Sequence, residues 1–258
     1  MLWSCRYATF ASILSAGGLF GGDVALGRDL VKQVPCKQVA SHAVKPQRFL
    51  TFDTLPFSPI GFTGRRTATR IARNPPRNPN FKWAIASRIE DKPLLEGLLE
   101  EIAKDLAPTS KISLPEIIIA NAKNHNELMS FTTRAKVVIN TVGPFRYFGV
   151  NVVKACVEGG AHYIDCCGEP EFYERCYLEC SKSSRENNVV VVHAAGWDSV
   201  PADLGVLACK LEFAKRGGVC NAVEMYHTLE HGPLGFSLNY ATYASAVRVR
   251  CFLYCLGC

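Results

Sequence analysis

The stretch from Lys136 to Gly168 constrains the fold of this chain more than any other part of its sequence. It opens with a short apolar, mostly β-branched run, Val137–Val142, which stops at Gly143-Pro144. Such a run is typical of a strand buried on both faces of a parallel sheet. Apolar residues then recur at helical spacing over Gly149–Val157, and a second strand pattern covers His162–Asp165. The stretch therefore predicts a strand, a helix and a second, parallel strand.

The same alternation of strand and helix patterns continues over most of the chain. Further strands are predicted over Phe81–Ala86, Glu116–Ala120 and the valine run Val189–Val192, with helices after Gly64, over Asp91–Leu106, after Gly168 and after Ser199, the last with Leu204, Leu207, Ala208 and Leu211 inward. Such alternation requires right-handed crossovers within one shared sheet. We therefore predict an α/β fold, with a doubly wound, mostly parallel sheet and helices on both faces, from about residue 49 to residue 211.

Charge and cysteine usage argue against two classes of protein. A net charge of +6 over 258 residues is a mild bias, and the basic residues form no stripe with interleaved aromatic side chains, so we expect no nucleic-acid binding. Several of the 12 cysteines, including Cys156 and Cys209, lie within helical apolar patterns. The cluster of Cys251, Cys255 and Cys258 lacks the second pair that a structural zinc site needs. We expect reduced, mostly buried thiols and no metal site.

A dinucleotide-binding fold needs a glycine loop between its first strand and first helix, where backbone amides and the helix dipole meet the pyrophosphate. The candidate loop here reads SPIGFTG. Its candidate cofactor contacts are Ser58, Gly61, Phe62, Thr63 and Gly64. A simple glycine turn is the alternative, because short glycine motifs also occur by chance.

Three separated segments carry a resemblance to a known family. They are VGPF at 142 to 145, YIDCCGEP at 163 to 170 and AGWDSVPADLG at 195 to 205. In this order and spacing they resemble the saccharopine dehydrogenase-like oxidoreductases. The resemblance covers roughly residues 60 to 235. It implies a Rossmann-like fold with NADP as the cofactor, followed by a remnant of a second, antiparallel α+β domain.

The candidate loop departs from the pattern of that family. The family loop reads GASGFTG after an apolar strand, so Ser58 stands where the first glycine belongs. Upstream, Asp53, Pro56 and Pro59 do not suit a central strand, because proline donates no ladder hydrogen bond. We therefore expect a doubtful first strand, a loop forced outward by the Ser58 side chain, and weak NADP binding.

Further candidate cofactor contacts follow the other predicted strands. Arg88 follows the second strand, where an arginine favours the 2′-phosphate of NADP and an acid would favour NAD; a solvent-facing arginine is the alternative. Asn121 follows the third strand, where the resembled family has an aspartate near the adenine, and an ordinary turn residue is the favoured alternative. Val142, Gly143 and Pro144 end the fourth strand, and the resemblance places them beside the nicotinamide. A plain turn at a helix start is their alternative.

Candidate substrate contacts lie on two loops at the same edge of the predicted sheet. Arg146 and Tyr147 follow the fourth strand, and Asp198 and Ser199 follow the sixth. Ser199 and Asp203 also suit the start of a helix, and capping is the favoured role for both. The sequence identifies no catalytic base and no set of metal ligands.

The two ends of the chain are interpreted separately from the central fold. Residues 1–48 are predicted to be a disordered or leader segment: a mitochondrial leader is one alternative, and an unstructured extension is the favoured one. Residues 49–212 form the expected NAD(P)-binding domain. Residues 213–258 are expected to be the truncated start of a substrate or dimerisation domain, and the apolar stretch at its end is too short to span a bilayer.

Two functions from different classes fit this sequence. The first is an NADP-dependent oxidoreductase that acts on a small-molecule or lipid substrate, with lipid or glycolipid metabolism implied by the resemblance. The second is a non-catalytic interaction protein on the same scaffold. The resemblance also implies a cytoplasmic-side location at a lipid droplet or membrane surface, and oligomers among full-length relatives.

Overall fold

The computed structural model describes residues 52–74, 80–105 and 113–226, together with residues 233, 242, 243, 245 and 247. The predicted leader, the C-terminal cysteine cluster and more than half of the predicted second domain lie outside these residues. Within the described ranges, no helix has both the length and the apolar character that a bilayer crossing needs.

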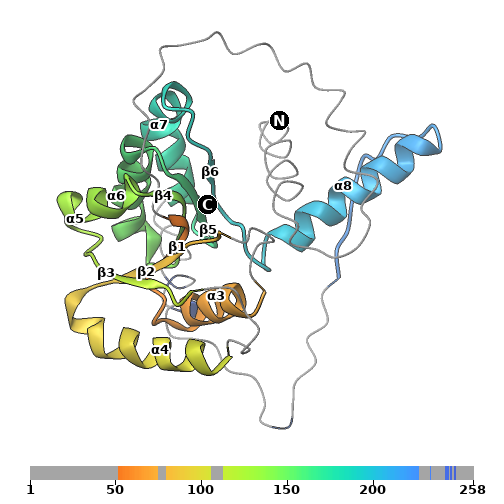
Figure 1. Cartoon of the computed structure of the whole chain (residues 1–258). Coiled ribbons are helices and arrows are strands. Elements are labelled where there is room, and N and C mark those ends of the chain that lie inside the picture. Colours follow the sequence, from red (N-terminus) through yellow and green to blue (C-terminus); the bar gives the residue numbers. More distant parts are fainter. Residues whose placement is uncertain are drawn as a thin grey trace.

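The described residues form a six-stranded sheet flanked by helices (Figure 1). The strands are β1 (Phe52–Phe57), β2 (Ala84–Ser87), β3 (Glu116–Ile119), β4 (Ala135–Asn140), β5 (His162–Asp165) and β6 (Val191–Val192). The helices are α3 (Phe62–Arg73), the short 3-10 turn η1 (Ile89–Asp91), α4 (Lys92–Asp105), α5 (His125–Thr132), α6 (Phe145–Gly159), α7 (Pro170–Glu186) and α8 (Val200–Lys215). All neighbouring strands are parallel, in the order β3-β2-β1-β4-β5-β6. The predicted doubly wound α/β fold is confirmed.

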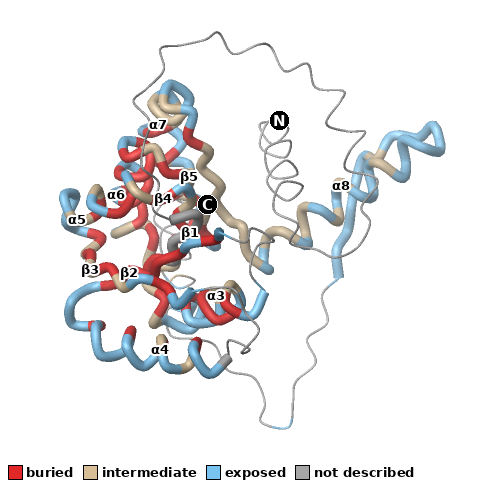
Figure 2. The backbone as a smooth tube through the Cα atoms, viewed as in Figure 1, coloured by how far each residue is buried: buried red, intermediate tan, exposed pale blue. Residues whose placement is uncertain are grey.

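Helices cover both faces of the sheet, and each face has its own core. Side chains alternate across the sheet along β2, so Ile85 packs in a cluster with Trp83 and with Leu95 of α4, while Ala84 and Ala86 join the larger cluster on the other face. Figure 1 shows α3 and α4 on one side of the sheet and α5, α6 and α7 on the other. Buried residues run through the strands between these two layers (Figure 2). This packing fixes the positions at which the strands end.

β1 lies at the centre of the sheet, although its sequence predicted a doubtful strand. It pairs with β4 along its length but with β2 only at Phe57, opposite Ala86. The N–H of Ser58 donates to the carbonyl oxygen of Ala86 in β2 (2.7 Å). Backbone polar groups alternate between the two sides of a strand, so position 56 also faces β2, where Pro56 has no N–H to donate. The proline shortens one ladder without abolishing the strand, and the prediction was wrong.

Two predictions about the far end of the sheet are also wrong. The run Val189–Val192 predicted a strand buried on both faces, but β6 is a two-residue, half-buried strand at the edge of the described sheet. α8 was expected to bury an apolar face, yet it has no buried residue, and Leu204 is 40% exposed. In Figure 1 α8 projects away from the sheet, so its apolar side chains do not reach the core.

The cysteines follow the same division between the core and α8. Cys156, Cys176 and Cys180 are buried on α6 and α7, as predicted, whereas Cys209 on α8 is exposed and contradicts the prediction. Burial raises the pKa of the Cys156 thiol far above its usual range. Among the described residues, no group of His, Cys, Asp and Glu side chains gathers as metal ligands would.

Candidate functional site

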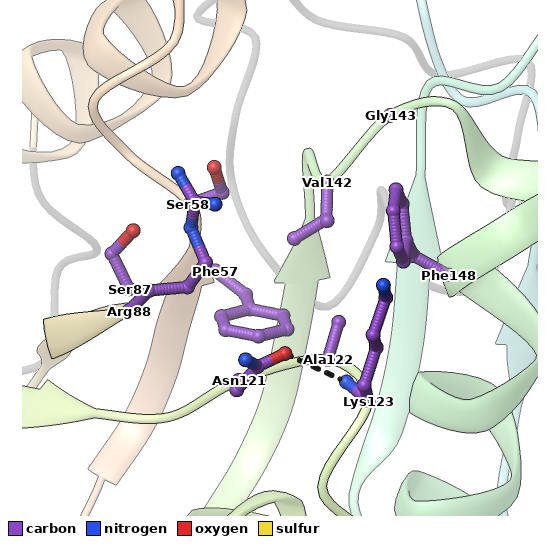
Figure 3. A pocket seen from close by; sticks show the side chains of 10 residues that line it. All are labelled: Phe57, Ser58, Ser87, Arg88, Asn121, Ala122, Lys123, Val142, Gly143 and Phe148. Carbon is purple, nitrogen blue, oxygen red and sulfur yellow. Dashed lines mark hydrogen bonds between the residues drawn. The ribbon is translucent and has the colours of Figure 1, made fainter. Parts of the chain in front are cut away.

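A cavity of about 290 Å³ lies at the carboxyl edge of the sheet, where β1, β2, β3 and β4 end (Figure 3). Its lining residues are Phe57, Ser58, Ser87, Arg88, Asn121, Ala122, Lys123, Val142, Gly143 and Phe148. The strand order reverses between β1 and β4, and open α/β sheets bind ligands outside the carboxyl ends of the strands at such a point. The structure thus brings together five of the predicted cofactor contacts, namely Ser58, Arg88, Asn121, Val142 and Gly143.

Ser58 makes the turn from β1 to α3 with a φ of 61°, in the left-handed region. Glycine enters this region freely, whereas a residue with a Cβ pays about 1 to 2 kcal/mol. The turn nevertheless stays compact, because the Thr141 hydroxyl donates to the carbonyl oxygens of Phe57 (2.7 Å) and Ser58 (3.0 Å). The loop is therefore strained but not displaced outward as we had expected.

The start of α3 has the features of an anion site. Its first helical hydrogen bond runs from the N–H of Arg65 to the carbonyl oxygen of Gly61 (2.8 Å), so the three amides before Arg65 lack helical partners. No side chain caps this end, and its first turn contains no acid. A Cβ on Gly61 would meet no atom within 4 Å, whereas a Cβ on Gly64 would lie 2.3 Å from the Ser58 carbonyl oxygen. Gly61 leaves room for a phosphate, and Gly64 lets α3 approach the turn closely.

The other five predicted cofactor contacts, Gly61, Phe62, Thr63, Gly64 and Pro144, do not line the cavity. Phe62 and Thr63 form the start of α3, and their side chains are exposed. Pro144 is the N-cap residue of α6 and follows the cavity-lining Gly143. The backbone amides of Phe62 and Thr63, in the first turn of α3, are the groups that a helix start offers to an anion.

Arg88 follows β2 and is oriented by Asp91. The Arg88 Nε donates to Oδ2 of Asp91 (3.0 Å), Nη2 donates to Oδ1 (3.2 Å), and the Ser87 hydroxyl donates to Oδ2 (2.8 Å). Burial of the Asp91 carboxyl opposes its ionisation, but the hydrogen bonds from Arg88 and Ser87 and the Arg88 charge outweigh burial and lower its pKa. A guanidinium has five N–H donors, of which two bind Asp91 here, so Arg88 retains donors for a phosphate.

Asn121 acts as a turn residue and also lines the cavity, so the two alternatives for it do not conflict. Its Oδ1 accepts the N–H of Lys123 (3.0 Å), and its own N–H donates to Glu127 (2.8 Å). Sequence reasoning missed the other five lining residues, which are Phe57, Ser87, Ala122, Lys123 and Phe148. The asparagine two residues before Lys123 is typical of such a side-chain turn and could have drawn attention to the lysine.

The four predicted substrate contacts do not line this cavity. Arg146 on α6 forms an ion pair with Glu171 of α7, and Tyr147 is 58% exposed. Asp198 is exposed, and Ser199 is the N-cap residue of α8 but makes no side-chain capping hydrogen bond. The prediction that Ser199 lies at the helix start is therefore correct, but the prediction that its side chain caps the helix is wrong.

A chain of buried polar side chains crosses β4, β5 and the end of β6 beside the cavity. Asn140 accepts the N–H of the cavity-lining Val142 (3.0 Å) through Oδ1 and donates from Nδ2 to the Tyr163 hydroxyl (2.9 Å). That hydroxyl also hydrogen bonds Asp165, whose Oδ2 lies 2.7 Å from Nδ1 of His193. Burial, then the charge of Asp165, raises the pKa of Tyr163 well above its usual value. The loop after β4 is thus tied to the loop after β6.

A buried carboxylate occupies the start of α6. Glu169 accepts the backbone N–H of Phe145 through Oε1 and of Arg146 through Oε2, both at 3.1 Å, and the Ser245 hydroxyl also donates to Oε1. Glu169 is only 4% exposed. The protein itself therefore supplies the negative charge that the start of α6 favours, whereas α3 has none.

Known proteins match this chain over the same region. Residues 60–194 match the family described as the saccharopine dehydrogenase NADP binding domain. A human saccharopine dehydrogenase-like oxidoreductase is 37% identical over 199 residues, which are 76% of this chain and 45% of that protein. The lipid droplet localized protein of Caenorhabditis elegans is 36% identical over 198 residues, 76% of this chain and 44% of that protein. This chain spans less than half the length of these relatives.

A solved structure supports the fold independently. Apo saccharopine dehydrogenase (L-Glu forming) from Saccharomyces cerevisiae matches with a TM-score of 0.50 at 16% identity, over 64% of this chain and 32% of that one. This likeness bears on the Rossmann-like fold alone. The family match itself spans just over half of the chain and includes the start of α3, Arg88 and the loop after β4. The chain therefore belongs to the saccharopine dehydrogenase family and carries its NADP-binding domain.

Proposed function

We propose that this chain holds NADP in the cavity described above and acts as an oxidoreductase on a lipid-related substrate. The observation that carries the proposal is Arg88, which lines the cavity after β2 while the start of α3 lies beside it without an acid. Bound NADPH would supply the hydride for a reduction. The residues of the chain bind and orient it.

Each part of the cavity has a role in this proposal. The first-turn amides of α3 hold the pyrophosphate, because the helix dipole and unpaired N–H groups favour negative charge there. Arg88 holds the 2′-phosphate, and Asp91 keeps the guanidinium in place. None of the ten residues lining the cavity is a carboxylate, the group that binds the free ribose hydroxyls of NAD. The proposal therefore includes a preference for NADPH over NADH.

Calorimetric titration of the purified chain with NADPH and with NADH tests this assignment. The unmodified chain should bind NADPH more tightly, and Arg88→Ala should abolish the difference by weakening NADPH binding roughly ten- to hundredfold, the range expected for a charged hydrogen bond. Arg185→Ala removes an exposed arginine on α7 and should leave both affinities unchanged. An NADPH preference that survives in Arg88→Ala would show that the 2′-phosphate binds elsewhere.

The lipid-related substrate rests on a relative rather than on the cavity. The C. elegans relative is described as localized to lipid droplets, which favours a substrate or a location at a lipid surface. To test the reaction, the chain is mixed with NADPH and enoyl- or carbonyl-containing lipids, and the oxidation of NADPH is measured by the loss of its absorbance. The second candidate is a non-catalytic protein of the lipid surface. Flotation of the chain with lipid droplets, without any measurable NADPH affinity, would favour that candidate.

A further inference from the structure

The cavity contains a second cationic side chain whose charge Asp91 does not balance. Arg88 and Lys123 are the two cations among the ten residues lining the cavity. Arg88 is paired with Asp91 through two hydrogen bonds, so the charge of that pair is balanced. Lys123 follows β3, and Figure 3 shows its side chain extending toward Phe148, on the opposite side of the cavity from Ser58 and Arg88. The cavity thus has a cationic side chain on each of two walls, and Asp91 balances only the charge of Arg88.

The backbone of Lys123 is fixed before any ligand binds. Its N–H donates to Oδ1 of Asn121 (3.0 Å), and the N–H of Asn124 donates to the Asn121 carbonyl oxygen (2.9 Å). Asn124 in turn caps α5 by accepting the N–H groups of Asn126 and Glu127. A lysine on such a turn keeps its Cα in place, so less chain entropy is lost when its ammonium binds an anion.

The Lys123 ammonium is also directed by an aromatic ring. Nζ lies 5.5 Å from the centroid of Phe148 on α6, within the range of a cation–π contact. That contact directs the ammonium toward Phe148, which lines the same cavity as Val142 and Gly143 at the end of β4. Glu127, in the first turn of α5, accepts the N–H of Asn121 and an N–H of Asn124 Nδ2. It is therefore engaged by the turn itself.

We propose that Lys123 binds the pyrophosphate of the dinucleotide from the wall opposite α3. This contact offsets the affinity that is lost because Ser58, with its strained φ, stands where the family loop has its first glycine. The inference rests on the proposed NADP site. Pyrophosphate is the anionic group common to NADPH and NADH, whereas the 2′-phosphate belongs to NADPH alone. Lys123 therefore contributes to overall affinity, and Arg88 contributes to the choice between the two cofactors.

Calorimetric titrations with NADPH, NADH and 2′-AMP, which has no pyrophosphate, test this division of roles. Lys123→Met should weaken the binding of NADPH and of NADH by a similar factor of roughly ten, because one charged contact is lost. The binding of 2′-AMP should stay unchanged. Lys123→Arg should retain binding. Lys210→Met, an exposed lysine on α8, is the control and should change nothing. Lys123 is exposed, so the thermal midpoint should not move in either variant at this position.

The outcomes distinguish this inference from the proposed function. If the unmodified chain binds neither NADPH nor NADH, both proposals fail. If it binds them and Lys123→Met has the same affinities, the role of Lys123 alone is overturned. If Lys123→Met lost affinity for NADPH but not for NADH, Lys123 would be placed at the 2′-phosphate. If it bound 2′-AMP more weakly, Lys123 would be placed at the adenosine. Either result also overturns the assignment to the pyrophosphate.

Discussion

The imidazole Nδ1 of His193 lies 2.7 Å from Oδ2 of Asp165, a carboxylate whose side chain is completely buried. The other oxygen of Asp165 accepts the backbone N–H groups of Cys167 (3.0 Å) and Ala194 (3.1 Å). One side chain therefore joins the loop that follows β5 to the loop that follows β6.

Asp165→Ala should lower the free energy of unfolding by about 3 to 5 kcal/mol, because buried donors on two loops lose their acceptor together. Urea denaturation followed by circular dichroism measures this change. Glu100→Ala removes an exposed carboxylate from α4 and should change the stability by less than about 0.5 kcal/mol. If the two variants were equally stable, Asp165 would not hold the loops together.

Ser58→Gly should raise the free energy of unfolding by roughly 0.5 to 1 kcal/mol, because it relieves the left-handed strain at the cost of a more flexible unfolded chain. NADPH affinity should also rise, since Ser58 lines the cavity. Ser58→Ala keeps the Cβ and should gain no stability. Thermal melts and calorimetric titration of both variants provide the comparison. A gain in Ser58→Ala equal to that in Ser58→Gly would show that φ is not the cause.

Gly61→Ala and Gly64→Ala should separate binding from stability. A methyl group on Gly64 would collide with the Ser58 carbonyl oxygen, so we expect a loss of about 1 to 3 kcal/mol in unfolding free energy. A methyl group on Gly61 meets open space, so that variant should fold normally while binding NADPH less tightly. Parallel melts and titrations measure both effects. Normal NADPH binding by Gly61→Ala would argue against a phosphate at this turn.

Asp91 should make part of the stability depend on pH. Its pKa is lowered in the folded chain, whereas a free aspartate titrates near pH ~3.9. The stabilisation is therefore present above about pH 4 and is lost as the pH falls through the folded pKa. We expect the stability difference between the unmodified chain and Asp91→Asn to be constant from about pH 5 to 7 and to shrink below about pH 4. Urea titrations across this range would show it, and a difference that persists unchanged in acid would contradict it.

The cysteines should differ sharply in reactivity toward alkylating reagents. Burial raises the pKa of the Cys156 and Cys176 thiols, so little of the reactive thiolate forms, and reagent has little access. Cys209 on α8 is exposed and should react before either of them. Mass spectrometry after brief treatment of the native chain with iodoacetamide gives the order. Alkylation of Cys156 as fast as Cys209 would show that α6 is not packed as described.

Local patterns in the sequence predicted most of the elements of the fold. The strand at His162–Asp165 and the end of α6 at Gly159-Gly160 followed from apolar spacing and glycine placement alone. α5 was missed because it is short, although Asn124 and Glu127 at its start are typical of a helix cap. β1 was misjudged because local preference opposed it, and pairing with β4 overrode that preference.

The candidate site was predictable only where its residues follow strands directly. Arg88 and Asn121 could be placed because the carboxyl ends of parallel strands share one edge. The contact between Lys123 and Phe148 depends on how α6 lies against the turn after β3. The bond between Asp165 and His193 depends on the register of β5 with β6. Neither relationship is contained in any local stretch of sequence.

The two helix starts at this edge of the sheet give a bound dinucleotide a direction. Because the Glu169 carboxylate already sits on the first amides of α6, a phosphate placed there would meet a like charge in a poorly hydrated setting. The same phosphate at α3 meets none from the first turn of that helix. We therefore expect a bound dinucleotide to place its pyrophosphate at α3 and to turn its nicotinamide toward β4 and β5.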